Sequence, residues 1–203
     1  MGRPSKNETK RSELLVKAKE CFLKFGYEKT SLDDIASSMK MNKSSLYYYI
    51  NNKEDLFTEI LVNEAVELMS KLFQRLETVV DPIEKFHAFF EGRTDVYISI
   101  IKLNGMDKET ILDIEKQIIE IYNANTRRDY VFLENLLVSN NLTKFKGESL
   151  KTYINLLFRT VHSLKLEAVL MTDILNGNDE PINTLKENIK LNLNLLLYTT
   201  YQF

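Results

Sequence analysis

The sequence has few of the residues that interrupt helices or cross-link a chain. Its 203 residues include one cysteine, three prolines and six glycines. The single cysteine, Cys21, excludes an internal disulfide. Because it lies in an apolar helical pattern, we interpret it as a small core residue rather than a redox sensor. The prolines and glycines fall at the joints between periodic segments, which predicts an almost entirely helical chain without strands.

Long apolar runs and the motifs of catalysis are also missing. No apolar run approaches the 18 residues of a membrane span, and the first ten residues lack the apolar segment of a secretory signal. We therefore expect a cytoplasmic protein with no membrane partner. The two histidines and one cysteine show no metal-ligand spacing, and no glycine-rich phosphate loop occurs. We expect no catalytic residue, no metal and no cofactor, and therefore no enzyme.

Charge is distributed unevenly, although the net charge is only −2. Residues 1–53 carry 11 Lys and Arg against 6 Asp and Glu, which is a net charge of +5. Residues 54–203 carry 16 against 23, a net charge of −7. A basic N-terminal domain (1–53) on an acidic second domain (54–203) favours contact between the first domain and a polyanion.

Helical periodicity runs through both parts of the chain. The apolar spacing predicts a first helix over residues 9–25, ended by Gly26 as a C-terminal cap. The fold class is therefore all-α, with about nine helices in total. The later helices are expected over residues 53–76, from 82 past 90, 95–103, 107–139, 150–168 and 182–201.

Two short capped helices are predicted between the first helix and the long one. Ser31 and Asp34 form a capping-box pattern at the start of a helix over residues 32–38. Asn42 can cap a second helix over residues 43–50. Two such helices joined by a turn of about four residues make a helix-turn-helix, whose second helix enters the major groove of DNA.

Three consecutive tyrosines lie on that second helix. A helix turns about 100° per residue, so three neighbours fan over roughly 200°, which is wider than a core-facing stripe. Leu46 and Ile50, four residues apart, are expected to hold the helix to the core, with Tyr49 on the same side. Tyr47 and Tyr48 are then expected to face outward.

The outward side chains suit DNA chemically. Lysine can donate to guanine, serine can donate or accept, and a tyrosine hydroxyl can bond to phosphate while its ring packs on sugar or a thymine methyl. A lysine at the start of the next helix would add a phosphate anchor, and the basic segment GRPSK could reach a minor groove. The predicted DNA-binding residues are Ser31, Lys43, Ser44, Ser45, Tyr47, Tyr48 and Lys53.

The stretch TSLDDIASSMKMNKSSLYYYINNKEDLF, after a helix that ends in CFLKFGY, resembles the DNA-binding head of TetR-family transcriptional regulators. Leu46-Tyr47, the aromatic residues that follow, and Lys53 with the acidic residues and Leu56 after it carry the resemblance. It covers roughly residues 10–58. Lys40 stands where the family usually has glycine in the turn, and a left-handed conformation there would cost roughly 1 kcal/mol.

The resemblance implies a three-helix head and a helical body that binds a small-molecule effector and forms a homodimer through its last two helices. An apolar seam over residues 150–168 and a last helix that is apolar on more than one side favour such an interface over a monomer core. Two heads on a two-fold axis would read a roughly palindromic operator. The expected interface residues are Leu157, Val161, Leu164, Ala168, Leu193 and Leu196.

The effector itself is unknown. Aromatic and histidine side chains of the body are candidate ligand contacts, although such residues at helical spacing are more often core. The candidates are Phe86, His87, Phe90, Tyr97, Tyr122, Phe158 and His162.

Taken together, these patterns predict a ligand-responsive homodimeric repressor that binds a palindromic operator in double-stranded DNA. The alternative is a dimeric helical protein-interaction module without specific DNA binding. A steeply salt-dependent affinity for one palindrome would distinguish the repressor from the interaction module.

Overall fold

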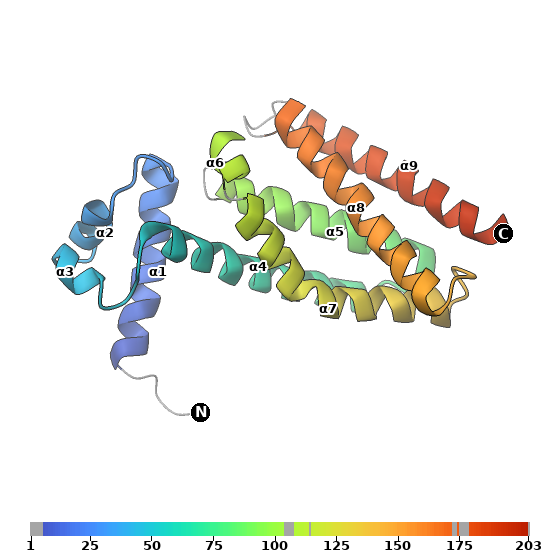
Figure 1. Ribbon diagram of the computed structural model, residues 1–203, viewed down its shortest axis with the longest axis horizontal. Helices are drawn as coiled ribbons and strands as arrows, with labels where there is room; N and C mark the ends of the chain where they lie inside the picture. Colours follow the sequence, from blue (N-terminus) through green and yellow to red (C-terminus); the bar gives the residue numbers. More distant parts are fainter. Residues whose placement is uncertain (1–5, 104–107, 114, 172–173, 175–178, 203) are drawn as a thin grey trace. The chain divides into compact units, whose positions relative to one another are not determined.

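The computed structural model describes residues 6–103, 108–113, 115–171, 174 and 179–202. Within these residues the chain forms nine α-helices and no β-strand, which confirms the all-α fold class (Figure 1). The chain divides into two compact units, which we call the head unit and the body unit. The head unit comprises Met1–Glu67 and Ser99–Gln117, and the body unit comprises Leu68–Ile98 and Ile118–Phe203. The domain boundary expected after residue 53 stays a prediction.

The head unit contains three N-terminal helices, the first part of a long fourth helix, and a short sixth one. Rings of α1 and α4 meet in its core, where the centroids of Phe22 and Phe57 lie 4.9 Å apart, edge to face. Gly26 ends α1 with a φ of 81°, and its N–H donates to the carbonyl of Phe22, as expected of a C-terminal cap. These helices are α1 (Lys6–Phe25), α2 (Leu32–Ser38), α3 (Lys43–Leu46), α4 (Lys53–Glu77) and α6 (Lys108–Asp113).

Helix α3 is shorter than the sequence predicts. Residues 43–50 were expected to be helical, but the regular helix ends at Leu46. Beyond it, the N–H groups of Tyr48 and Tyr49 donate to carbonyls three residues back, so that the segment tightens into turns. Consecutive aromatic residues favour helix weakly, and the side chain of Asn52 caps α4 by accepting from the Asp55 N–H at 2.7 Å.

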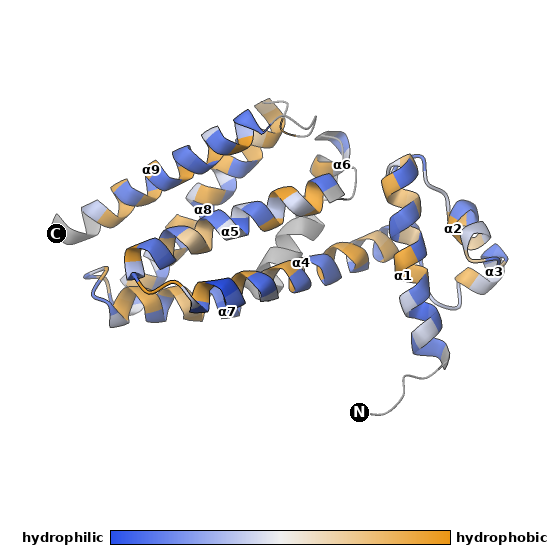
Figure 2. Ribbon diagram, turned by 180° about the vertical axis from the view of Figure 1, so that it is seen from behind, coloured by the Kyte–Doolittle hydropathy of each residue, from blue (hydrophilic) through white to orange (hydrophobic). Residues whose placement is uncertain are grey.

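The body unit is a packed set of long helices. Helices α8 and α9 lie side by side and run antiparallel in both views (Figures 1 and 2). Figure 2 also shows apolar and polar residues mixed around α9. No described helix combines the length and the apolar character that crossing a membrane requires. Most of α5 (Pro82–Leu103) and α7 (Glu115–Ser139) and all of α8 (Gly147–Met171) and α9 (Glu180–Gln202) belong to this unit.

Helix α5 corrects two expectations from the sequence. Separate segments were expected before residue 90 and over residues 95–103, but α5 is continuous. The hydroxyl of Thr94 donates to the carbonyl of Phe90 at 2.8 Å, so this polar residue is satisfied inside the helix. Gly92 lies within the helix rather than at a joint. An added Cβ at this position would clash with the side chain of Leu72 on α4.

The long helix expected over residues 107–139 is described in two parts. Two helices, α6 and α7, lie on either side of residue 114, which is outside the described residues. The polar stretch NANTRRD, at the middle of the expected helix, belongs to α7. Asp129 in this stretch is buried, so polarity in the sequence did not mean exposure.

Candidate functional site

The caps of α2 and α3 define the helix-turn-helix of the head unit. The hydroxyl of Ser31 accepts from the Asp34 N–H at 3.2 Å, and the Asp34 carboxylate accepts from the Ser31 N–H at 2.8 Å. Two hydrogen bonds from Ser31 to the Asp34 carboxylate lower the pKa of Asp34. The bond from the Ser31 hydroxyl has the larger effect, and the bond from its backbone N–H has the smaller one. Asn42 Oδ1 accepts from the Ser45 N–H at 2.8 Å. Both predicted caps are therefore confirmed.

The three tyrosines differ in exposure as their helical spacing predicts. Leu46 and Ile50 are buried in the head. Tyr47 is 51% exposed and Tyr48 is 73% exposed, whereas Tyr49 is half-buried. The rings of Tyr48 and Tyr49 lie edge to face with centroids 5.1 Å apart. The segment thus presents two phenols to solvent, while Leu46 and Ile50 attach it to the head.

Lys43, at the first position of α3, has a partner on α2. Its Nζ lies 2.7 Å from Oδ2 of Asp33, and both side chains are largely exposed. This hydrogen bond and the charge of Asp33 raise the pKa of Lys43. Ser44 and Ser45, which follow on the same helix, are exposed. Asp33 therefore compensates the positive charge of Lys43, a residue that the sequence analysis predicts to contact DNA.

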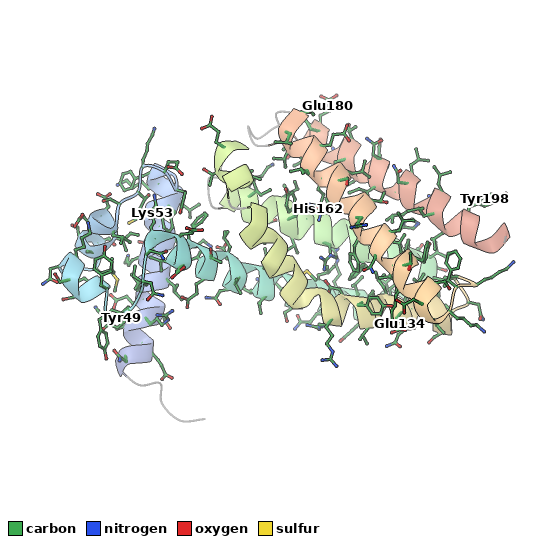
Figure 3. All side chains as sticks on the ribbon, in the orientation of Figure 1. Tyr49, Lys53, Glu134, His162, Glu180 and Tyr198 are labelled. Carbon is green, nitrogen blue, oxygen red and sulfur yellow. The ribbon has the colours of Figure 1, made fainter. Side chains whose placement is uncertain are left out.

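The side chain of Lys53, at the start of α4, turns back to the protein instead of pointing outward as a phosphate contact would (Figure 3). Its Nζ donates to the carbonyl of Tyr27 at 2.9 Å and approaches the carbonyl of Glu28 at 3.5 Å. The same ammonium lies 4.2 Å from the centroid of the Tyr27 ring. Lys53 thus ties the start of α4 to the turn after α1. Its predicted phosphate contact stays a prediction.

Arg11 is a residue of the site that the sequence did not reveal. Its guanidinium donates to the carbonyl of Tyr49 and pairs with the carboxylate of Glu59 at 2.5 Å. Arg11 and Glu59, together with Tyr47–Tyr49, line a shallow pocket beside the tyrosines. Arg11 lies on α1, 38 residues before Tyr49, and no local pattern distinguishes it from other exposed arginines.

The turn and the N-terminal arm complete the head. Lys40 has a φ of 55°, so this residue does adopt the left-handed conformation that glycine favours. Residues 1–5, which make up most of the predicted basic arm, lie outside the described residues. Just after them, Asn7 Nδ2 donates to the hydroxyl of Tyr48 at 3.2 Å. The first described residues thus already contact the outward face.

Several predicted effector contacts lie together in the body unit. The ring centroids of Phe86 and Phe90 are 5.2 Å apart, and those of Phe90 and Phe158 are 5.9 Å apart. Tyr97 is buried. Burial lowers the pKa of the half-buried His87, and a hydrogen bond with Asn194 opposes this by raising it.

Two predicted contacts remain less defined. His162 is half-buried on α8 and is labelled in Figure 3. The side chain of Tyr122 lies outside the described part of the chain. All seven effector assignments remain predictions, because core packing also explains the burial of the aromatic ones.

The body interior also holds charged residues that the sequence analysis missed. Arg93 on α5 forms an ion pair with Asp129 on α7, and the two side chains are 6% and 1% exposed. Lys165 on α8 is 3% exposed. The burial of Lys165 could have been predicted from the sequence, because Lys165 continues the i, i+4 spacing of the buried residues Leu157 and Val161.

The predicted interface residues do not share one surface of the protomer. Leu157, Val161 and Leu193 are buried within the chain itself. Leu164 and Ala168 instead line an open groove between α8 and α9. Leu196 is half-buried. Among the described side chains of α9, the strongly exposed apolar ones are Leu191, Leu195 and Tyr198.

Comparison with known proteins agrees with the geometry of the head. Residues 14–60 match the family described as bacterial regulatory proteins, tetR family. The HTH-type transcriptional repressor KstR2 of Mycolicibacterium smegmatis is 33% identical over 87 residues, which cover 43% of this chain and 42% of that protein. The HTH-type transcriptional activator FasR of the same species is 30% identical over 88 residues, covering 43% and 40%. These matches confirm the resemblance found in the sequence.

A solved structure extends the likeness to the whole fold. The crystal structure of a transcriptional regulator from Cytophaga hutchinsonii matches with a TM-score of 0.72 and 18% identity, covering 94% of this chain and 97% of that one. At this identity the match shows the fold. In sequence, the matched part of the chain spans about two fifths of the length of the curated relatives.

Proposed function

We propose that this chain, whose residues 14–60 match the TetR family of bacterial regulatory proteins, is a transcriptional regulator that binds operator DNA as a homodimer. The observation that carries the proposal is the exposure of Tyr47 and Tyr48 on a capped helix-turn-helix. Two adjacent exposed phenols in a basic head have few uses other than contact with a polyanion. We propose no enzymatic activity.

The outward face of α3 and of the turns that follow it supplies the contacts to DNA. Tyr47 and Tyr48 donate their hydroxyl protons to phosphate oxygens, and Lys43 reaches a base edge or phosphate after leaving Asp33. Ser44 and Ser45 are small and exposed, so the helix can lie deep in the major groove. Ser31 supports this face through the cap of α2, and Lys53 adds a phosphate contact.

The body supplies the dimer interface. Exposed positions of α9 repeat at spacings of four and three residues, which is the pattern of a helix-packing stripe. Leu164 and Ala168 border the same stripe through the groove between α8 and α9. We propose that this α9 stripe meets its copy in a second protomer, whereas Leu157, Val161 and Leu193 stay in the core. The stripe consists of Thr184, Asn188, Leu191, Leu195 and Tyr198.

An effector bound in the body would weaken operator binding by favouring a form of the dimer that does not fit the operator. The coupling needed is modest, about 1–3 kcal/mol between the two sites. We propose repression as the sign of regulation because KstR2 is named a repressor. FasR is named an activator, so the sign needs its own test with a reporter gene under the identified operator.

The decisive experiment is selection of bound duplexes from a random-sequence library, followed by fluorescence anisotropy with the selected duplex and a scrambled one. We expect a palindromic sequence with half-sites about one helical turn apart and an affinity at least about 10³-fold above that for the scrambled duplex. The selected affinity should fall as salt rises.

Two variants make the test specific for the tyrosine face. Tyr47→Ala should lose operator affinity, whereas Phe25→Ala, which removes another exposed aromatic residue of the head, should keep it. If no sequence is enriched and both variants behave like the wild type, the protein is a helical interaction module instead of an operator-binding regulator.

A further inference from the structure

The exposed tyrosines lie beyond the end of a regular helix. Helix α3 ends at Leu46, and residues 47–49 continue as turns. We call residues 47–50 the tyrosine segment. Carbonyl groups past the end of a helix have no later helical N–H to bind, so they need donors from elsewhere. The position of Tyr47 and Tyr48 therefore depends on contacts between this segment and other parts of the head.

Arg11 on α1 supplies such a donor. Its Nη1 donates to the carbonyl of Tyr49, which is labelled in Figure 3, and its Nη2 lies 2.5 Å from Oε2 of Glu59 on α4. A guanidinium carries five N–H donors in a rigid plane, so one arginine can hold both acceptors in a fixed geometry. Arg11 thus joins the tyrosine segment to two helices of the head unit.

A second residue of α1 contacts the same segment. Asn7 lies four residues before Arg11, so the two side chains share one face of the helix. Asn7 Nδ2 donates to the hydroxyl oxygen of Tyr48 at 3.2 Å. A tyrosine hydroxyl can accept one hydrogen bond and donate another, so this contact leaves its proton for a phosphate oxygen. The start of α1 thus contacts both the backbone and one phenol of the tyrosine segment.

The Arg11–Glu59 pair contributes geometry rather than charge or stability. The two side chains are 45% and 32% exposed, and ion pairs so exposed stabilise a fold only weakly. Their opposite charges compensate each other, so the pair as a whole adds no net charge that would attract phosphate. It does join three segments of the head that are distant in the sequence, including the one that presents Tyr47 and Tyr48.

We propose that Arg11 and Glu59 are positioning residues for operator binding, which hold the tyrosine segment in the conformation that fits the operator. The proposal rests on the proposed function, because it assigns how the DNA-contacting segment is held. Non-specific DNA binding depends mainly on charge, whereas specific binding needs side chains in register with bases and phosphates. Loss of the pair therefore lowers the preference for the operator over other duplexes.

The double variant Arg11→Met/Glu59→Gln tests the proposal in the full chain. It removes one positive and one negative charge, so the net charge of the head is unchanged. Anisotropy should show about 10- to 100-fold weaker binding to the selected operator and nearly unchanged binding to the scrambled duplex. This range corresponds to about three- to tenfold for each of the two heads, the effect of one weak hydrogen bond per head.

The single variant Glu59→Gln separates positioning from electrostatics by the sign of its effect. Removing a carboxylate from a DNA-binding head should, by charge alone, strengthen binding to every duplex. If Glu59 holds Arg11 in place, operator affinity should instead fall while scrambled affinity rises or stays constant. Lys17→Met/Glu20→Gln is the matched control, because it removes an exposed pair that lies within α1. It should leave both affinities unchanged.

Hydrogen–deuterium exchange of the free protein measures the positioning without DNA. Peptides that cover residues 47–52 should exchange faster in Arg11→Met/Glu59→Gln than in the wild type, because a segment with fewer contacts opens more often. Peptides of α9 should exchange as in the wild type. Thermal unfolding checks that each variant is folded, and Glu59→Gln, which keeps Arg11, decides the result alone if the double variant unfolds.

The outcomes separate this proposal from the proposed function. Unchanged exchange over residues 47–52, or wild-type operator affinity in the folded variants, would overturn the positioning role. An equal loss on both duplexes with a smaller salt slope would also overturn it, by making Arg11 a direct phosphate contact. If the random library yields no operator, the proposed function fails, while the exchange result still decides whether the pair holds the tyrosine segment.

Discussion

Lys43 on α3 and Asp33 on α2 form a salt bridge across the helix-turn-helix, with Nζ 2.7 Å from Oδ2. The bridge joins a lysine that we propose as a DNA contact to a carboxylate that phosphate would repel. In the free protein it holds Lys43 against its own head. In the proposed complex, a DNA phosphate or base would replace Asp33 as the partner of Lys43, and the cost of that exchange can be measured.

Removing this carboxylate should strengthen DNA binding. Asp33→Asn should raise affinity for operator and scrambled duplex about two- to fivefold, because exposed ion pairs are weak and the repulsion of phosphate disappears with the charge. Anisotropy at low salt measures the change. Glu148→Gln removes the carboxylate of a comparable exposed pair with Lys151 in the body and should change nothing. Weaker binding by Asp33→Asn would mean that Asp33 itself contacts the operator.

Lys53→Ala should have two separable effects. The head should unfold at a lower temperature, because the ammonium no longer bonds to the carbonyls of Tyr27 and Glu28. If Lys53 also contacts phosphate, affinity for all duplexes should fall alike, and the slope of log affinity against log salt should shrink by about 0.9. Lys24→Ala, at another lysine packed over an aromatic ring, is the control. An unchanged slope would leave Lys53 with a structural role only.

Lys40→Gly should stabilise the head. Lys40 has a φ of 55°, where a residue with a Cβ is strained and glycine is not. We expect a gain of about 1 kcal/mol or somewhat less, since glycine also has more freedom in the unfolded chain. Thermal unfolding followed by circular dichroism measures it. Asn141→Gly is the matched control, because Asn141 has a φ of 52° and asparagine tolerates this conformation. A lower unfolding temperature for Lys40→Gly would contradict the strain.

Charged residues on α9 should separate the dimer without unfolding the protomer. The double variant Leu191→Glu/Leu195→Glu should sediment as a folded monomer, because both side chains are exposed and face the proposed partner. Leu157→Glu should instead unfold the body, because Leu157 is fully buried. Val66→Glu, at an exposed valine of α4, should leave the oligomeric state unchanged. A dimeric double variant would place the interface elsewhere.

Lys165 should make the free energy of unfolding rise as the pH rises. Its pKa in the folded chain lies well below 10.5, so the unfolded state binds more protons between the folded and unfolded pKa values. The free energy of unfolding should therefore rise with pH in that window, by at most about 1.4 kcal/mol per unit. Urea unfolding at several pH values measures the slope.

Replacing the amine identifies the source of that slope. Lys165→Met should be more stable than the wild type near neutral pH, with the advantage shrinking as the pH rises. Arg93 and Tyr97 on α5, which act on Lys165 through charge and through the Tyr97 ring, are retained in this variant. Lys151→Met should keep the wild-type slope. Parallel curves for wild type and Lys165→Met would contradict the buried-amine interpretation.

The head was largely predictable because its signals are local. Ser31, Asn42 and Gly26 cap helix ends through hydrogen bonds that span only three or four residues, so their roles follow from sequence spacing. The exposure of Tyr47 and Tyr48 was predicted from the helical period and holds although the regular helix ends at Leu46.

The partners of charged residues were not predictable, because they depend on packing between distant segments. Arg11 meets Tyr49 and Glu59, and Lys53 turns back to Tyr27, through contacts more than 25 residues apart in the chain. No periodicity records such pairings.

The sequence by itself determined the helical class, the caps, the resemblance of the head to the TetR family and the exposure of two tyrosines, since these rest on local spacing and residue type. Tertiary structure alone decided which apolar residues of α8 and α9 are core and which remain exposed. An apolar pattern predicts that a helix face is buried, but it does not tell whether the same chain or a second protomer covers that face. Leu157 is enclosed by its own chain, whereas Leu191 is exposed. Tertiary structure also brought Arg93, Asp129 and Lys165 together from three helices, a charge arrangement that exists only once those helices pack.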